Sequence, residues 1–163
     1  MKNKTAIIKF KRRREKKTNY KKRLALLKSE KTRLVIRKSI SNISIQFINF
    51  DTEGDKTVVT IVSTELKKLG WTKGGNIPAA YLTGLLAGKK AKEKKIVEAI
   101  LDLGLQTSTK GSRLYAALKG VLDSGVNIPH SESILPKEDR IKGKHISEDV
   151  AKQFEDVKKK IEG

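Results

Sequence analysis

Three segments in the first half of the chain alternate between apolar and polar residues, as strands with one buried face do. In residues 33–38, Leu34 and Ile36 share one face, and the opposite face is partly basic. The alternation repeats in residues 43–50, and residues 57–64 are rich in β-branched side chains, which favour strands. Because only short connections separate these three strands, we expect them to form an antiparallel meander.

Farther along the chain the spacing of apolar residues becomes helical. Residues 76–90 open with Asn76, a favourable helix cap, and residues 112–123 and 147–161 each carry an apolar stripe at helical spacing. The short apolar run at residues 96–103 predicts a fourth strand. Residues 129–144 are polar and predict an ordered loop or an extension.

These elements predict an α/β (α+β) fold, with a mixed, mostly antiparallel sheet and helices packed on one of its faces. We divide the chain into a basic N-terminal arm and helix (residues 1–32), an α/β core (33–127) and a C-terminal extension with a terminal helix (128–163). The uncovered sheet face is expected to carry a set of polar residues: Arg33, Arg37, Ser44, Gln46 and Thr60.

Positive charge is concentrated at the beginning of the chain. Of the net charge of +19, residues 1–38 contribute +15 and residues 39–163 only +4. Such a segment attracts polyanions, nucleic acid first and an anionic membrane second. A solvated tail would account for the basic run at residues 11–17, but not for the basic residues of the helix and strand that follow. We therefore predict that the N-terminal segment contacts the phosphates of a nucleic acid.

Aromatic residues flank this basic run. Phe10 precedes it, and Tyr20 follows it near the start of the first helix, which Thr18 or Asn19 can cap. Lys and Arg neutralise phosphates, Arg and Tyr stack on unpaired bases, and Ser and Gln reach base edges or 2′-hydroxyls. This combination favours RNA as the polyanion.

The composition excludes several other classes of function. The chain has no cysteine and only two histidines, which excludes thiolate chemistry and leaves little for a metal site or a catalytic triad. The absence of cysteine also fits a reducing compartment. No apolar run approaches the ~20 residues that span a bilayer, and no secretory signal is recognisable. We expect no metal, no cofactor and no membrane association.

An alternating group of carboxylates, Asp51, Glu53 and Asp55, resembles a calcium-binding loop at first sight. A calcium loop of the helix-loop-helix kind requires an acidic residue at its twelfth position, which here is Val62. Because Asp and Gly are turn-forming residues, we interpret the segment as a hairpin turn.

A glycine-rich loop at residues 104–112 leads into one of the predicted helices. Lys110 precedes Gly111, so the order required of a nucleotide-binding phosphate loop is reversed. The N-terminus of a helix nevertheless offers free N–H groups to a phosphate, and Lys110 and Arg113 add positive charge. We expect a phosphate contact here, with a plain loop-to-helix junction as the alternative.

Six segments, in this order along the chain, together resemble the ribosomal large-subunit protein eighteen family in its archaeal and eukaryotic form. They are residues 20–29, 33–39, 76–90, 101–105, 109–120 and 128–132. The length of the chain favours the archaeal type.

The resemblance implies a structural protein of the large ribosomal subunit, without catalytic activity, in the cytoplasm. It would bind 5S rRNA and help attach it to 23S rRNA in the central protuberance, beside the ribosomal large-subunit protein five family, and it would have no small-molecule substrate. The alternative is a nucleic-acid-acting enzyme, a nuclease or an RNA-modifying enzyme, that uses the basic arm to bind its substrate. Such an enzyme needs clustered acid/base or metal-binding residues, and the sequence offers only the acidic turn at residues 51–55.

The residues expected to contact RNA come from the arm, the first helix, the first two strands and the glycine-rich loop. The resemblance carries over Arg37, Ser39, Gln46 and residues 110–113; the basic and polar pattern supplies the others. The full set is Lys11, Arg12, Arg13, Arg14, Lys16, Lys17, Thr18, Tyr20, Arg23, Arg33, Arg37, Lys38, Ser39, Gln46, Lys110, Gly111, Ser112 and Arg113. No catalytic residue and no metal ligand is expected.

Overall fold

A computed structural model describes residues 8–72 and 74–163. Its centre is a mixed sheet in the spatial order β3-β2-β1-β4, with β1 (Arg33–Lys38), β2 (Ile43–Asn49), β3 (Lys56–Val62) and β4 (Ile100–Asp102). β1 pairs antiparallel with β2, and β2 antiparallel with β3, whereas β4 pairs parallel with β1. The predicted meander and the mostly antiparallel sheet are therefore confirmed.

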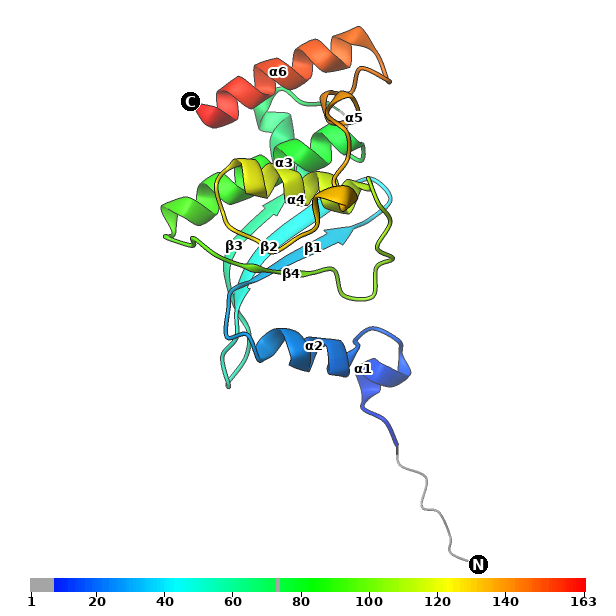
Figure 1. Cartoon of the computed structure of the whole chain (residues 1–163), viewed down its shortest axis with the longest axis vertical. Helices are drawn as coiled ribbons and strands as arrows, with labels where there is room; N and C mark the ends of the chain where they lie inside the picture. Colours follow the sequence, from blue (N-terminus) through cyan, green and yellow to red (C-terminus); the bar gives the residue numbers. More distant parts are fainter. Residues whose placement is uncertain (1–7, 73) are drawn as a thin grey trace, which may run out of the picture.

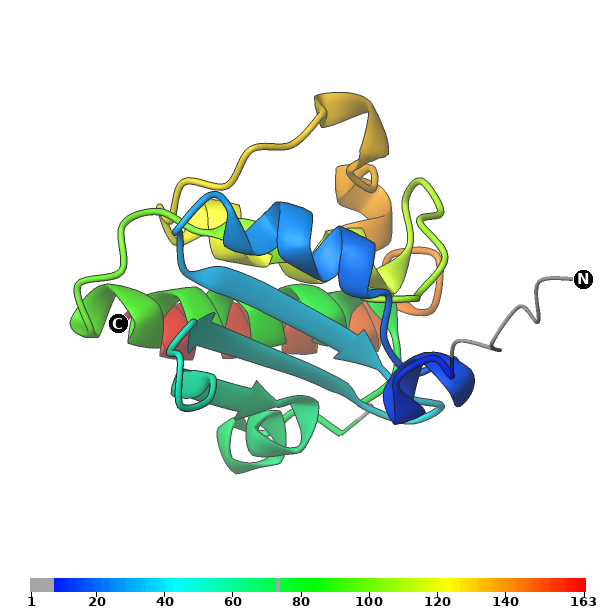
Figure 2. The ribbon, with the colours of Figure 1, turned by 90° about the horizontal axis from the view of Figure 1, so that it is seen from below.

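The helices form layers on both sides of this sheet. They are α1 (Lys11–Arg14), α2 (Tyr20–Leu27), α3 (Ile77–Glu93), α4 (Arg113–Asp123), α5 (Glu138–Lys142) and α6 (Glu148–Glu162), with 3₁₀ helices η1 (Ser63–Leu69) and η2 (Glu132–Ile134). Helices α3 and α4 cover one face of the sheet, and α6 packs on the outer side of α3 (Figure 1). Helix α2 crosses the opposite face (Figure 2).

The helix boundaries follow the local signals in the sequence. The Asn76 Oδ1 accepts a hydrogen bond from the backbone N–H of Ala79 at 2.9 Å and caps α3. The Ser147 hydroxyl accepts from the N–H of Val150 at 3.3 Å and caps α6 in the same way. Gly125 follows α4 with a φ of +93°, a conformation that only glycine adopts without strain. These three predicted boundaries are confirmed.

The hydrophobic core has two parts. One lies between the sheet and helices α3 and α4, and its largest strand residue is Phe47 of β2. The other lies on the far side of α3, where Trp71 and Phe154 of α6 are almost completely buried. The long helix α3 contributes to both parts, so it joins the C-terminal extension to the sheet.

Helices α3 and α4 approach each other backbone to backbone. A Cβ built on Gly84 of α3 would lie 2.1 Å from the carbonyl oxygen of Ala117 in α4. A Cβ on Gly120 of α4 would lie 2.1 Å from the carbonyl oxygen of Tyr81 in α3. No side chain fits at either position, so glycine is what allows this close crossing.

The structure also differs from the sequence prediction in places. The strand expected at residues 96–103 is only β4, because Ile96 donates to the carbonyl of Ala91 and Ala99 donates to that of Asn127 instead of pairing with β1. The single turn α1 and helices η1, η2 and α5 have no clear periodicity in the sequence. The sheet face expected to be open is partly covered by α2.

Candidate RNA-binding surface

The N-terminal basic segment is exposed and is folded back by its own contacts. All four residues of α1 are basic and exposed. The Arg12 Nε donates to the Thr18 hydroxyl at 2.9 Å, which brings α1 close to the start of α2. The Lys17 ammonium lies 2.9 Å from a carboxylate oxygen of Glu15. The predicted basic cluster is thus a compact group of exposed cations.

Helix α2 makes polar contacts with the rest of the protein, and none of its own residues is buried. The Arg23 guanidinium lies 2.8 Å from Oδ2 of Asp55, in the connection between β2 and β3. The Lys22 ammonium donates to the carbonyl of Gly104 at 3.5 Å. The helix predicted to begin near Tyr20 therefore forms, but it buries no apolar stripe, and Leu24 is exposed.

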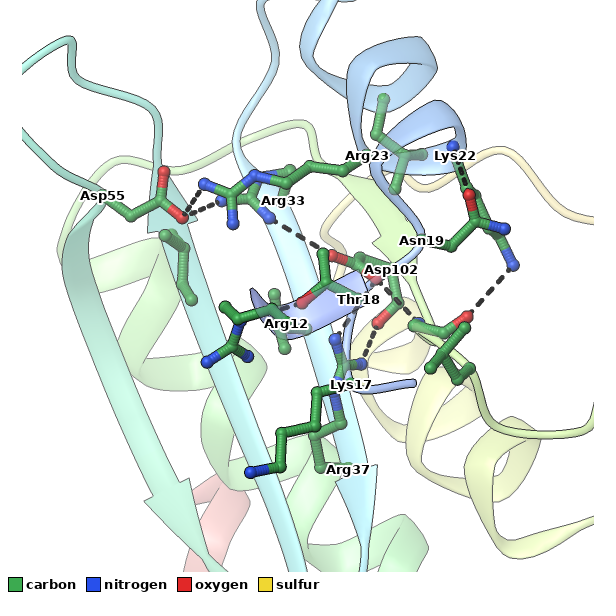
Figure 3. Close-up of a pocket in the computed structure, with 15 residues that line it drawn as sticks. Arg12, Lys17, Thr18, Asn19, Lys22, Arg23, Arg33, Arg37, Asp55 and Asp102 are labelled. Carbon is green, nitrogen blue, oxygen red and sulfur yellow. Dashed lines mark hydrogen bonds and ion pairs between the residues drawn. The ribbon is translucent and has the colours of Figure 1, made fainter. Parts of the chain in front are cut away.

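A cavity of about 220 Å³ lies between α2 and the sheet (Figure 3). Its lining comes from the arm, α2, strands β1, β2 and β4, the turn between β2 and β3, and the segment after β4. The lining residues are Arg12, Lys17, Thr18, Asn19, Lys22, Arg23, Leu26, Arg33, Val35, Arg37, Ile48, Asp55, Asp102, Gly104 and Leu105. The structure therefore brings together around one space six residues predicted to contact RNA: Arg12, Lys17, Thr18, Arg23, Arg33 and Arg37.

Two carboxylates hold the strand arginines at the bottom of this cavity (Figure 3). The Arg33 guanidinium lies 2.6 Å from Oδ2 of Asp55 and 3.2 Å from Oδ2 of Asp102. Arg37 lies 3.3 Å from Oδ1 of Asp102 and donates to its main-chain carbonyl at 2.7 Å. Asp102 also accepts from the N–H of Gly104 at 2.8 Å. One carboxylate thus fixes two arginines and the start of the following loop.

Arg33 corrects the prediction that it lies on an open sheet face. Only 4% of the residue is exposed, and both ends of its guanidinium are engaged with carboxylates. A buried cation is stable only when it is paired, and Asp55 and Asp102 supply that pairing. Arg33 therefore stabilises the lining of the cavity from a buried position. Arg37, whose side chain is partly exposed, remains open to the cavity.

The remaining predicted residues of the sheet lie at or near the surface. The Gln46 amide donates to the Thr60 hydroxyl at 3.3 Å, on the sheet face that α2 partly covers. The Ser39 hydroxyl accepts from the N–H of Asn42 at 3.0 Å and closes the hairpin between β1 and β2. Lys38 is exposed next to this hairpin. Gln46 and Lys38 present polar groups, whereas the role of Ser39 that the structure shows is in the turn.

The glycine-rich loop leads into α4 as expected. Lys110 is exposed, and Gly111 has a φ of +66° and donates its N–H to the carbonyl of Ile134 at 2.9 Å. Ser112 precedes the first residue of α4, and its hydroxyl makes no capping hydrogen bond. The junction therefore combines the beginning of a helix with an exposed lysine.

Arg113 connects this junction to two other segments. Its guanidinium donates to the carbonyl of Gly75 at 2.7 Å and to that of Ile40 at 3.3 Å. Ile40 lies at the tip of the β1–β2 hairpin, and Gly75 precedes α3. Arg113 therefore holds the glycine-rich loop, the hairpin and the start of α3 together, a role that the sequence does not indicate.

The acidic turn has structural roles. Gly54 donates its N–H to the carbonyl of Asp51 at 3.1 Å, which confirms the turn. The hydrogen bond from the Lys56 ammonium, followed by that from the N–H of Glu53, holds the pKa of the Asp51 carboxyl below its ordinary value. Within residues 8–72 and 74–163, no group of three or more His, Cys, Asp or Glu residues is placed to hold a metal ion.

In the same residues, no helix is long and apolar enough to cross a bilayer.

The sequence does not reveal the two carboxylates, Asp55 and Asp102, that pair with the arginines lining the cavity. The sequence pattern assigns Asp55 only to a turn and gives Asp102 no role. A signal for Asp102 exists, since it is a single carboxylate within the otherwise apolar end of the run at residues 96–103. A charge at such a position requires a buried partner, and the strand arginines are the nearest candidates.

Comparison with known proteins shows which class of protein this chain belongs to. Residues 4–99 and 88–131 match the family described as ribosomal large subunit proteins 60S L5, and 50S L18. The protein is therefore a ribosomal protein of the large subunit, and a structural component rather than an enzyme. The alternative of a nucleic-acid-acting enzyme is set aside.

Individual relatives narrow this assignment. Large ribosomal subunit protein uL18 of Korarchaeum cryptofilum is 60% identical over 141 residues, which cover 86% of this chain and 72% of the relative. Large ribosomal subunit protein uL18 of Methanothrix thermoacetophila is 48% identical over 161 residues, which cover 96% of this chain and 95% of the relative. The chain belongs to the archaeal uL18 branch of this family.

Proposed function

We propose that this ribosomal protein binds 5S rRNA and helps attach it to 23S rRNA in the central protuberance of the large subunit. The observation that carries the proposal is the convergence of the basic arm, α2 and the strand arginines around one polar cavity. A neighbouring protein of the ribosomal large-subunit protein five family is part of the same proposal, which rests there on family resemblance.

Different parts of the surface contribute to the affinity for RNA and to the choice of RNA. The exposed cations of α1 neutralise phosphates, and this contribution depends on salt and not on sequence. Arg37, Gln46 and the loop around Lys110 are held in fixed positions, so they recognise the shape of a folded RNA and its unpaired bases. We therefore assign non-specific attraction to residues 1–32 and the choice of RNA to the core at 33–127. The extension at 128–163 supports α3 through α6 and the second part of the core.

A competition experiment tests the specific claim. The full chain is bound to labelled 5S rRNA, and unlabelled tRNA is added in excess over a range of salt concentrations. We expect 5S rRNA to stay bound while the affinity falls steeply with salt. Equal competition by any RNA would reject 5S rRNA as the preferred ligand and leave only electrostatic attraction.

A pair of matched variants tests the role of the arm. Arg13→Gln with Arg14→Gln removes two exposed cations from α1, and Lys67→Gln with Lys68→Gln removes two exposed cations from η1. For the arm variant, we expect the slope of log affinity against log salt to decrease by about 0.7–0.9 for each phosphate that the protein no longer neutralises. The η1 variant should keep the parent slope. Identical slopes in all three proteins would mean that α1 does not contact phosphates.

A further inference from the structure

An exposed apolar surface lies beside the basic arm. The Phe10 and Tyr20 rings are in contact, with centroids 5.4 Å apart and planes inclined by 56°. Phe10 is 73% exposed, Tyr20 36% and Leu105, in the loop after β4, 53%. Side chains exposed to this degree leave part of their apolar area uncovered by the protein. They therefore keep apolar area available for a ligand.

Tyr20 and Leu105 both line a hollow of about 290 Å³. Apart from these two residues, its lining is polar or basic: Arg13, Lys16, Thr18, Asn19 and Lys21. The hollow thus combines an aromatic ring and an aliphatic side chain with a rim of cations. It is separate from the cavity in Figure 3, although Thr18, Asn19 and Leu105 line both.

The walls of this hollow come from two segments that polar contacts hold in place. On the arm side, Arg12 donates to the Thr18 hydroxyl at 2.9 Å, and the Asn19 side chain accepts from the N–H of Lys22 at 3.1 Å. On the loop side, Lys22 reaches the carbonyl of Gly104, the residue before Leu105. Tyr20 therefore has a defined position relative to Leu105, as a preorganised binding site requires.

We propose that this hollow binds one unpaired nucleobase, which stacks on Tyr20 and contacts Leu105, with Phe10 extending the aromatic surface. The phosphates on either side of that base lie against Arg13, Lys16 and Lys21. The proposal rests on the proposed function, since it names the part of an RNA that this site takes.

The chemistry of the rim favours a base over an apolar peptide. A nucleobase is flat and apolar on its faces and is flanked by negative charge, which matches an aromatic floor surrounded by cations. An apolar peptide segment would use the floor but would leave Arg13, Lys16 and Lys21 without counter-charges. The hollow is also the size of a single side chain or base rather than of a helix.

The test uses two single-stranded RNA hexamers and the full chain. One hexamer carries 2-aminopurine at an internal position, and the other has an abasic site there. Stacking on Tyr20 should quench the 2-aminopurine fluorescence, and the abasic hexamer should bind about five- to 150-fold more weakly, the range measured for loss of one stacked base. Equal binding of the two hexamers would overturn the proposal.

Variants assign the effect to the named side chains. Tyr20→Ala should weaken binding of the 2-aminopurine hexamer over the same range without changing its salt dependence, whereas Tyr20→Phe should retain the affinity. Leu105→Ala leaves the arm intact and should also weaken binding. Phe50→Ala, which removes an exposed phenylalanine just after β2, is the matched control and should change nothing.

Two further results separate this proposal from the proposed function. If Tyr20→Ala and Leu105→Ala bind both hexamers as the parent does, the stacking site is rejected whatever the behaviour of 5S rRNA. If the hexamers respond as expected but 5S rRNA shows no preference over tRNA, the base site stands and only the identity of its RNA is rejected. Circular dichroism of each variant checks that its overall secondary structure matches that of the parent.

Discussion

Arg33 of β1 and Asp102 of the neighbouring parallel strand β4 form a diagonal ion pair, with the guanidinium 3.2 Å from the carboxylate and both residues buried. Arg33 is also paired with Asp55, and Asp102 also holds Arg37 and the N–H of Gly104. The pair lies beneath the arm and α2. It therefore links the stability of the sheet to the shape of the surface that we assign to RNA.

Replacing Asp102 with Asn is expected to lower the free energy of unfolding by about 3 kcal/mol, at the lower end of the cost of breaking a buried ion pair. Arg33 would keep only Asp55 as a counter-charge. Urea denaturation followed by fluorescence of the buried Trp71 measures the loss.

Glu98→Gln is the matched control for this prediction. It breaks the ion pair between Glu98 and Lys31, in which both side chains are partly exposed. Because water and salt screen such a pair, we expect a loss of less than about 1 kcal/mol. Similar losses in the two variants would show that Asp102 is not an internal counter-charge.

Replacing Arg23 with Gln is expected to loosen α2 without disturbing the sheet. The variant removes the contact of α2 with Asp55 and leaves the buried pair of Arg33 intact. Amide exchange in α2 should become faster by up to about fivefold, which corresponds to a partly exposed ion pair of about 1 kcal/mol. Hydrogen exchange measured by mass spectrometry reports this change, and exchange in β2 should stay constant. An equal increase in Lys21→Gln, which removes a charge from the same helix, would exclude a specific role for Arg23.

Replacing Gly84 with Ala reverses the usual effect of this substitution in a helix. Helix propensity alone would make alanine more stable by about 1 kcal/mol. Here the new methyl group would meet the backbone carbonyl of Ala117, which cannot move aside, so we expect a net loss of about 1–3 kcal/mol. Gly88→Ala is the graded comparison, because its two closest contacts are side-chain atoms of Ser124, the hydroxyl oxygen at 1.9 Å and Cβ at 2.7 Å, rather than a backbone carbonyl. A stabilised Gly84→Ala variant would contradict the close crossing of α3 and α4.

Tyr81 is expected to make the free energy of unfolding depend on pH in the alkaline range. Burial, the hydrogen bond that its hydroxyl donates to Asp123 at 2.8 Å, and nearby negative charge raise the pKa of Tyr81 above its ordinary value of about 10. The folded state therefore disfavours the phenolate, and the stability present below about pH 10 is lost as the pH rises above that value.

Tyr81→Phe isolates this component. At neutral pH the variant lacks the hydrogen bond to Asp123 and should be less stable by about 1 kcal/mol. Between about pH 9 and pH 11, on either side of the ordinary pKa of a phenol, its free energy of unfolding should fall less steeply than that of the parent, because no phenol remains to ionise. Parallel pH profiles of the two proteins would reject the raised pKa.

Lys110 is expected to contribute to RNA binding, and Arg113 to the stability of the fold. Lys110→Ala should weaken RNA binding and reduce its salt dependence without changing the midpoint of thermal unfolding, because the side chain is exposed. Arg113→Ala should lower that midpoint, because it removes the hydrogen bonds to the carbonyls of Gly75 and Ile40. A thermal midpoint unchanged in Arg113→Ala would mean that the loop is held by other interactions.

The parts of the fold that are predictable depend on local patterns. Alternation along β1 assigns Leu34 and Arg33 to opposite faces, and the Asn76 cap locates the start of α3. The position of α2 is not predictable, because it depends on the contact between Arg23 and Asp55, which are 32 residues apart. Periodicity assigns a residue to a face but does not tell whether another element covers that face.

The same limit applies to the candidate site. The basic run of α1 is predictable because charge density alone indicates its attraction to phosphates. The buried state of Arg33 and the linking role of Arg113 are not, since a basic residue on a strand or at a helix start looks the same whether its partner is a ligand or a carbonyl. The hollow beside Tyr20 also requires the structure, because Leu105 comes from a distant loop.

The close approach of glycines between α3 and α4 fixes a distance as well as a packing arrangement. With backbone against backbone at Gly84 and Gly120, the spacing of the two helices is set by peptide geometry and not by the size of any side chain. Substitutions of neighbouring core residues are therefore not expected to move α4 relative to α3. The N-terminus of α4, with Arg113 and the preceding Lys110, is therefore held in position independently of the side chains packed beneath it.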